Sequence, residues 1–223
     1  MRSKSDTVSD ICAALLAGKR EDAASVARAE YPFTPFAEAK RAYTALQSTQ
    51  IFRRDGFIDR YSGQRLVFPG TLRLLSILLP DEFPNHPNWK MASAHQVYWE
   101  LFPTIDHVIP VARDGADDVT NWVTTSMVRN SAKANFTLEE LGWRMFPTGD
   151  LREWDGLTTW FLTFLSEEPT HVSDRYVQKW HRAAIQSTDP HLPKQAGQGI
   201  ARRACAPPCT CRVIVGIPPG RPI

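Results

Sequence analysis

An acid and an imidazole lie side by side in the middle of this chain, and two amides follow at short intervals. Asp106 and His107 are adjacent, Asn121 comes fourteen residues after His107, and Asn130 nine residues after Asn121. Hydrolysis of a phosphodiester needs an activated water and a positive charge near the leaving oxygen. A histidine is a suitable base for the water at neutral pH, and a hard cation can supply the charge.

These residues also match the chemistry of a magnesium site. Mg²⁺ takes oxygen ligands and keeps several waters, so one carboxylate and one amide oxygen from the protein can suffice. We therefore predict Asp106 and Asn130 as ligands of Mg²⁺ (or Mn²⁺) and His107 as the water activator. Asn121 ends the intervening loop, where its side chain can bind backbone groups and hold His107 in place. Successive strand residues point to opposite faces, so Asp106 and His107 need a local bend to serve one site.

The elements that must position these side chains are a strand, a loop, a second strand and a helix. β-Branched residues and alternation indicate the first strand, Asp-Gly and Asp-Asp favour the loop, and Ser126 is a candidate N-cap for the helix. The expected ranges are 104–111 for the first strand, 112–119 for the loop, 121–125 for the second strand and 127–135 for the helix. All of the predicted site residues then belong to one hairpin and the helix that follows it.

This arrangement resembles the HNH (ββα-metal) endonuclease family. The matching residues are Asp106-His107 with Pro110, then Asn121, then Asn130 with Lys133. With asparagine at the last motif position, the chain is similar to the His-Asn-Asn variant of the family, and it is also similar to the HNH domain of CRISPR effector nucleases. The resemblance implies that His107 and Asn121 are the catalytic residues, His107 as general base and Asn121 as a structural support. It also implies that the metal lies on Asp106 and Asn130.

Many members of that family carry four cysteines that bind a structural zinc. At the corresponding positions this chain has Asp59, Ser62, Ser126 and Arg129. Because serine and arginine are not zinc ligands, no structural zinc is expected. We expect an ion pair between Asp59 and Arg129, or plain packing, to replace the metal.

The expected fold class is α+β, with a ββα-metal core, flanking helices and a mostly helical chain overall. The resemblance covers about residues 51–145, and apolar periodicity stops near residue 187. The expected organisation is a helical N-terminal region over 1–50, an HNH nuclease domain over 51–147 with an insertion at about 69–103, C-terminal helices over 148–186 and a disordered tail over 187–223. Three cysteines of that tail have no fourth ligand and are expected to be incidental: Cys205, Cys209 and Cys211.

The placement of charge limits the strength of any nucleic-acid binding. Residues 36–147 carry twelve Lys/Arg and twelve Asp/Glu, and this neutrality is mild evidence against tight, salt-sensitive DNA binding. Arg53 and Arg54 can still face phosphates, and Lys133 either contacts phosphate or lies on the solvated face of its helix. No apolar run has membrane length, and acids soon follow the first basic residues. We therefore expect a cytoplasmic protein without a membrane partner or signal peptide.

The sequence therefore predicts an HNH endonuclease that hydrolyses phosphodiester bonds in DNA. Two alternatives stay open. One is a non-catalytic nucleic-acid-binding or interaction module that retains the HNH fold, which the neutral core favours. The other is an RNA-cleaving nuclease toxin. The presence of Asp106, His107 and Asn130 together favours an enzyme, while the sequence indicates neither a target sequence nor an oligomeric state.

Overall fold

The computed structural model describes residues 2–33, 42–88 and 90–188. The chain divides into two compact units, Met1–Arg41 and Ala42–Ile223. The three cysteines of the C-terminal segment, and the tail predicted there, lie outside the described residues. Within the described part of the chain, no helix has both the length and the apolar character needed to cross a bilayer.

The first unit is a pair of packed helices, α1 (Lys4–Leu16) and α2 (Arg20–Glu30). A capping box starts α1, in which the Ser3 hydroxyl accepts from the Asp6 amide and the Asp6 carboxylate accepts from the Ser3 amide. The turn between the helices contains Gly18 at a φ of +72°, a conformation that glycine adopts without steric cost.

Helix α3 (Ala45–Arg54) opens the second unit. The Thr44 hydroxyl accepts from the Gln47 amide at 3.1 Å, and the Gln47 side chain returns the bond to the Thr44 amide at 3.0 Å. This helix packs against α9 (Arg175–Thr188) and the second strand. The expected domain boundary at residue 50 therefore falls inside a helix, and the division lies at residue 41. The reason is that α3 buries Ile51 and Phe52 in the core of the second unit.

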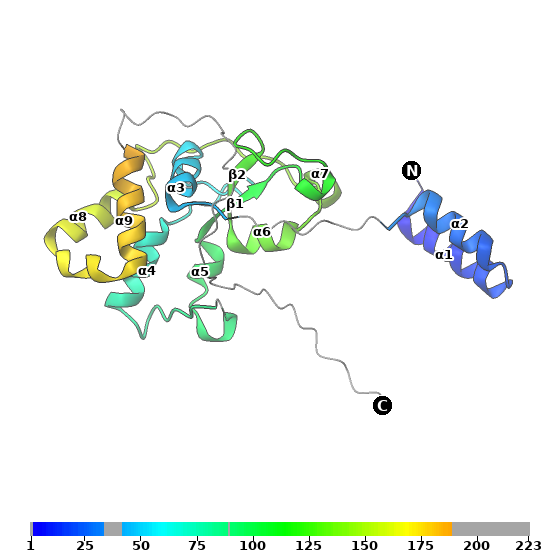
Figure 1. Cartoon of the computed structure of the whole chain (residues 1–223), viewed down its shortest axis with the longest axis horizontal. Helices are drawn as coiled ribbons and strands as arrows, with labels where there is room; N and C mark the ends of the chain where they lie inside the picture. The colour runs from blue at the N-terminus through cyan, green and yellow to red at the C-terminus, as the bar shows by residue number, and fades with distance from the viewer. Residues whose placement is uncertain (1, 34–41, 89, 189–223) are drawn as a thin grey trace, which may run out of the picture. The chain divides into compact units, whose positions relative to one another are not determined.

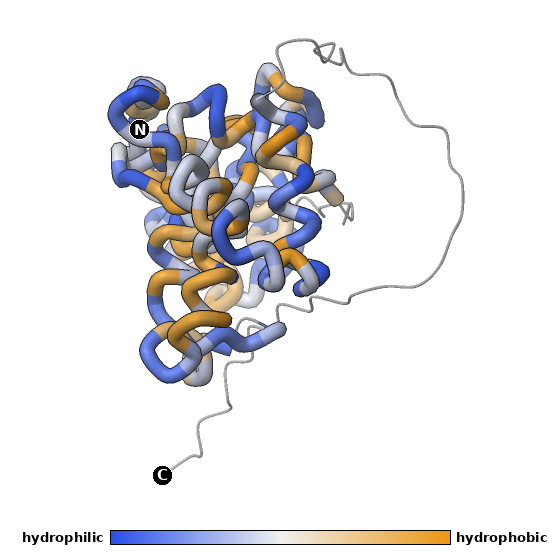
Figure 2. Tube along the Cα trace, turned by 90° about the vertical axis from the view of Figure 1, so that its left-hand side faces the viewer, coloured by the Kyte–Doolittle hydropathy of each residue, from blue (hydrophilic) through white to orange (hydrophobic). Residues whose placement is uncertain are grey.

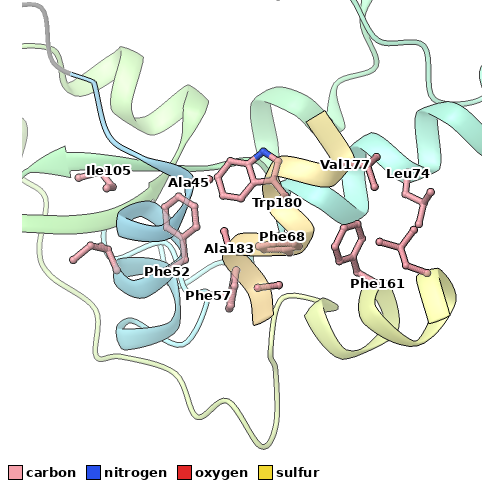
Figure 3. Close-up of a cluster of buried hydrophobic side chains, with 13 residues drawn as sticks. Ala45, Phe52, Phe57, Phe68, Leu74, Ile105, Phe161, Val177, Trp180 and Ala183 are labelled. Atoms are coloured by element: carbon pink, nitrogen blue, oxygen red, sulfur yellow. The ribbon is translucent and has the colours of Figure 1, made fainter. Parts of the chain in front are cut away.

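The main core joins α3 to helices from later parts of the chain, namely α4 (Pro69–Leu78), α8 (Thr158–Glu167) and α9. Trp180 of α9 stacks near Phe52 with ring centroids 6.5 Å apart and meets Phe68 edge-on at 5.5 Å (Figure 3). Stacked and edge-on aromatic pairs of this kind stabilise a core beyond their buried area. The segment expected as an insertion is therefore part of the packed unit, because α4 contributes Leu74 to this core. Short helices complete the unit, namely α5 (Val97–Glu100), α7 (Leu138–Leu141) and 3₁₀ turns at Met91–Ser93, Val111–Arg113 and Pro169–Ser173.

A two-stranded antiparallel sheet and one helix carry the residues of interest. Strand β1 (Pro103–His107) pairs with β2 (Trp122–Ser126) in a register that runs from Pro103↔Ser126 to His107↔Trp122. Helix α6 (Met127–Lys133) follows β2 directly and packs on both strands (Figure 1). The Ser126 hydroxyl accepts from the Arg129 amide at 3.3 Å, so the predicted N-cap is confirmed.

The mixture of strands and predominant helices is confirmed, and the predicted element order around the site is present. The first strand ends at His107 rather than at residue 111, because the chain turns at Pro110 into the Val111–Arg113 turn. Figure 2 shows hydrophilic and hydrophobic stretches following each other closely along the helices, which is typical of helices with one buried face.

Candidate active site

The loop between β1 and β2 is closed by the side chain of Asn121. Its Oδ1 accepts from the Ile109 amide at 2.9 Å, and its Nδ2 donates to the carbonyl oxygens of Ile109 and Ala116, both at 2.8 Å. A Cβ atom at Gly115 would collide with the Ile109 carbonyl, so only glycine fits there. The contacts that the sequence suggested for Asn121 are therefore present, and they determine the path of the loop.

His107 is the last residue of β1 and is 4% exposed. Its Nε2 lies 2.7 Å from Oδ1 of Asp117 and 3.0 Å from Nε1 of Trp122. Trp122 faces His107 across the strand pair, whereas Asp117 comes from the loop and its side chain is 51% exposed. Sequence reasoning missed Asp117. The available signal was an acid in the loop that Asn121 closes, but Asp114 and Asp118 carry the same signal.

Asp106 is 8% exposed and has partners different from those of His107. Its Oδ2 accepts from the Tyr61 hydroxyl at 2.7 Å and lies 2.9 Å from Nζ of Lys133. Burial and the neighbouring Asp106 carboxylate both raise the pKa of Tyr61, so that its hydroxyl keeps the proton it donates. The strand pairing stays regular through His107, so Asp106 and His107 point to opposite faces. The local bend expected from the sequence is absent from this pairing.

Lys133 is fully buried. Its Nζ donates to the His107 carbonyl oxygen at 2.6 Å in addition to the ion pair with Asp106. Both roles predicted for Lys133, a phosphate contact and a solvated face, are wrong in this conformation. The physical reason is that α6 turns this side toward β1, and a buried ammonium must be paired and hydrogen-bonded there.

Asn130 links α6 to the first strand. Its Nδ2 donates to Oγ1 of Thr104 at 3.0 Å and to the Ile105 carbonyl at 3.2 Å. Within the described residues, Oδ1 of Asn130 and Oδ1 of Asp106 accept no hydrogen bond. Both atoms are the hard oxygen donors that Mg²⁺ prefers, so the donor set fits the predicted cation chemically. The same described residues contain no group of three or more His, Cys, Asp and Glu suited to a metal ion.

One of the four positions that carry zinc ligands in the HNH family, which the chain resembles, holds a hydrogen-bonded carboxylate here, Asp59. Asp59 is fully buried and accepts from the Tyr61 amide at 2.9 Å, the Thr125 hydroxyl at 3.0 Å and the Ser126 amide at 2.9 Å. The expected ion pair with Arg129 is wrong, because the Arg129 guanidinium lies over the Trp143 ring, 5.1 Å from its centroid. Asp59 thus joins its own turn to the end of β2 without any charged partner at Arg129.

The two arginines predicted to contact DNA end α3. The Arg54 guanidinium donates to the carbonyl oxygens of Val119 at 2.9 Å and Trp122 at 2.6 Å. It also pairs with the buried Asp55 at 2.9 Å. These bonds give Arg54 a structural role in holding the β1–β2 loop against α3. Arg53 is half-buried and stays a predicted DNA contact.

The structure therefore brings Asp106, His107, Asn121 and Asn130 onto one hairpin and one helix, with Asp106 and His107 on opposite strand faces. Comparisons with protein-family models, curated proteins and solved structures find no match for the chain.

Proposed function

We propose that the chain is an endonuclease of the HNH type, which hydrolyses phosphodiester bonds in DNA with His107 as the general base. The observation that carries this proposal is the way His107 is held. Its Nε2 is engaged by Asp117 and Trp122, the Asn121 side chain closes the loop beside it, and Nδ1 has no partner among the described residues. A histidine oriented by a carboxylate, with its other nitrogen unoccupied, is the usual arrangement of a general base.

Each of the other residues has a role that follows from its contacts. Asn130 and Lys133 fasten α6 to β1, and Tyr61 with Lys133 orients the Asp106 carboxylate. Asp106 and Asn130 are the residues that would hold Mg²⁺ or Mn²⁺ through their unpaired oxygens. Because Asp106 and His107 point to opposite faces of β1, the proposal requires the end of β1 to bend when substrate binds. When bound, such a cation would stabilise negative charge on the phosphate and on the leaving oxygen. Because Lys133 already neutralises Asp106, we expect the cation to bind weakly.

A cleavage assay tests this proposal. The protein is incubated with supercoiled plasmid DNA and, separately, with RNA, each with Mg²⁺, with Mn²⁺ or with a chelator. We expect the plasmid to be nicked or linearised only when the cation is present. His107→Ala should abolish cleavage while the circular dichroism spectrum stays that of the wild type.

The matched control is His86→Ala, which removes a histidine that, within the described residues, accepts one hydrogen bond, from the Asn88 amide. Full cleavage by His107→Ala, or equal loss in both variants, would contradict the role of His107. Cleavage of RNA alone would move the substrate from DNA to RNA and leave the base assignment in place.

One observation favours the non-catalytic module as a second candidate. The Asp106 carboxylate is already satisfied by a buried ammonium and a tyrosine hydroxyl, which is what a purely structural carboxylate requires. A folded wild-type protein that binds DNA fragments but cleaves neither nucleic acid with Mg²⁺ or Mn²⁺ would select this module over the nuclease.

A further inference from the structure

We infer that Asp117 is the positioning residue of the site, which holds the proton of His107 on Nε2 and leaves Nδ1 as the basic nitrogen. The catalytic meaning of this assignment rests on the proposed nuclease function. The assignment of the proton rests on the geometry around the imidazole alone.

Two groups compete for Nε2 of His107. The indole N–H of Trp122 can only donate and lies at 3.0 Å, and the ionised carboxylate of Asp117 can only accept and lies at 2.7 Å. A proton on Nε2 is donated to Asp117, and the Trp122 N–H then has the same Asp117 oxygen within 3.3 Å. Without that proton, two lone pairs would face each other across 2.7 Å. The first arrangement satisfies all three groups, and the second leaves Asp117 repelled.

The loop delivers Asp117 to this position. Asn121 binds the carbonyl oxygen of Ala116, the residue immediately before Asp117, at 2.8 Å, and its own amide donates to the Asp118 carbonyl at 3.1 Å. Asp117 is therefore held between two anchored neighbours. Asn121 thus supports His107 through Asp117, in addition to fixing the backbone at Ile109, two residues after the end of β1.

Within the described residues, neither of the other two loop acids bonds to His107. The Asp118 carboxylate accepts from the amide and the hydroxyl of Thr120, at 2.9 and 2.6 Å, and these hydrogen bonds lower the pKa of Asp118. Asp114 ends the Val111–Arg113 turn in a left-handed conformation with a φ of +63°. Asp117 is thus the loop acid that reaches His107, and Asp114 offers a control for loss of loop charge.

Removing Asp117 should reverse the tautomer. In Asp117→Ala the Trp122 N–H is the partner of Nε2 that remains among the described residues, so Nε2 must accept and the proton moves to Nδ1. The lone pair then lies on Nε2, where it accepts from the Trp122 N–H and is no longer available as a base. We expect kcat to fall by roughly 10²-fold or more, within the range that a general base contributes. KM should stay within about threefold, since Asp117 bonds to the general base and is assigned no contact with the substrate.

The experiment reads the tautomer directly. Protein labelled with ¹⁵N-histidine is studied by two-bond ¹H–¹⁵N correlation at mildly alkaline pH, where imidazoles are neutral, with His107→Gln to assign the signal. We expect the Nε2–H pattern in the wild type and the Nδ1–H pattern in Asp117→Ala. Asp114→Asn should keep the wild-type pattern, as should Trp122→Phe, in which Asp117 still accepts.

Each result decides one question. An unchanged tautomer in Asp117→Ala, or a reversal in Trp122→Phe instead, would overturn the role of Asp117 whatever the cleavage assay shows. A reversal in a protein that cleaves neither DNA nor RNA would support the positioning of His107 and reject the nuclease. If Asp117→Ala does not fold, the same spectrum of Asp117→Asn decides, since its uncharged oxygen is a weaker acceptor and should yield a mixture of both tautomers.

Discussion

Replacing Lys133 with methionine tests the buried ion pair that holds α6 to β1. The change keeps a side chain of similar length and removes the ammonium. Within the part of the chain that the structure describes, Asp106 then retains the Tyr61 hydroxyl alone as a partner, and the His107 carbonyl loses a donor at 2.6 Å. Because Lys133 is fully buried and Asp106 is 8% exposed, water cannot readily replace the missing charge.

The expected loss is that of a buried pair with one partner removed, about 3–5 kcal/mol of unfolding free energy. For a unit of this size, that corresponds to a fall in Tm of about 6–20 °C. Urea unfolding followed by tryptophan fluorescence measures it, because all seven tryptophans belong to the second unit. Exposed Lys90→Met is the matched control and should change stability by less than about 0.5 kcal/mol.

A second variant separates the charge from the packing. Lys133→Met combined with Asp106→Leu removes both partners, so no charge is stranded and the double variant should be more stable than Lys133→Met alone. A loss below about 1 kcal/mol in Lys133→Met, or a double variant that is less stable still, would refute the buried pair.

The same variant also tests the cation site. Removing the ammonium should strengthen the attraction of the Asp106 carboxylate for Mg²⁺. A ligand that binds the folded state raises its Tm, so about 10 mM Mg²⁺ should raise the Tm of Lys133→Met more than that of the wild type. Equal shifts would remove Asp106 from the predicted metal ligands while leaving the ion pair intact.

Two further predictions concern buried or partly buried carboxylates that support the second unit. Asp59→Ala leaves the Thr125 hydroxyl and the Ser126 amide without an acceptor in the interior. It should lower the free energy of unfolding in urea by about 2–4 kcal/mol. An unchanged stability would mean that packing alone holds this turn to the end of β2. Burial disfavours the ionised form of Asp174 and so raises its pKa. Hydrogen bonds from Arg73 and from backbone amides outweigh this effect and lower the pKa below the ordinary 3.8. A carboxyl group whose pKa is lowered by folding stabilises the fold at pH values above its ordinary pKa. That contribution disappears as the pH falls through the pKa of the folded state. The stability difference between wild type and Asp174→Asn should therefore shrink below about pH 4, and a difference independent of pH would contradict this.

Local features of the site could be predicted from the sequence. Ser126 caps α6 as expected, since such a cap depends on residues only three apart. The order of strand, loop, strand and helix follows from alternation and turn residues over about thirty positions. The contacts of Asn121 were predictable in kind, because a loop closed by an amide needs only backbone groups nearby.

The burial of Lys133 could not be predicted, because it depends on Tyr61, which lies 72 positions away along the chain. Asp59 likewise bonds residues 66 and 67 positions away, and a pairing with Arg129 was equally consistent with the spacing. The end of the N-terminal unit was misplaced because α3 belongs to the core formed with α9, and periodicity does not tell which core a helix joins.

The sequence by itself determined which residues are candidates for the chemistry, and the tertiary structure decided which of them lie together. Asp106, His107, Asn121 and Asn130 are recognisable by type and spacing. Among three loop acids, however, only Asp117 meets His107, because Asn121 holds the backbone at Ala116. The physical reason is that spacing sets the period and the caps of each element, while hydrogen-bond partners and burial depend on where distant elements bring their side chains together.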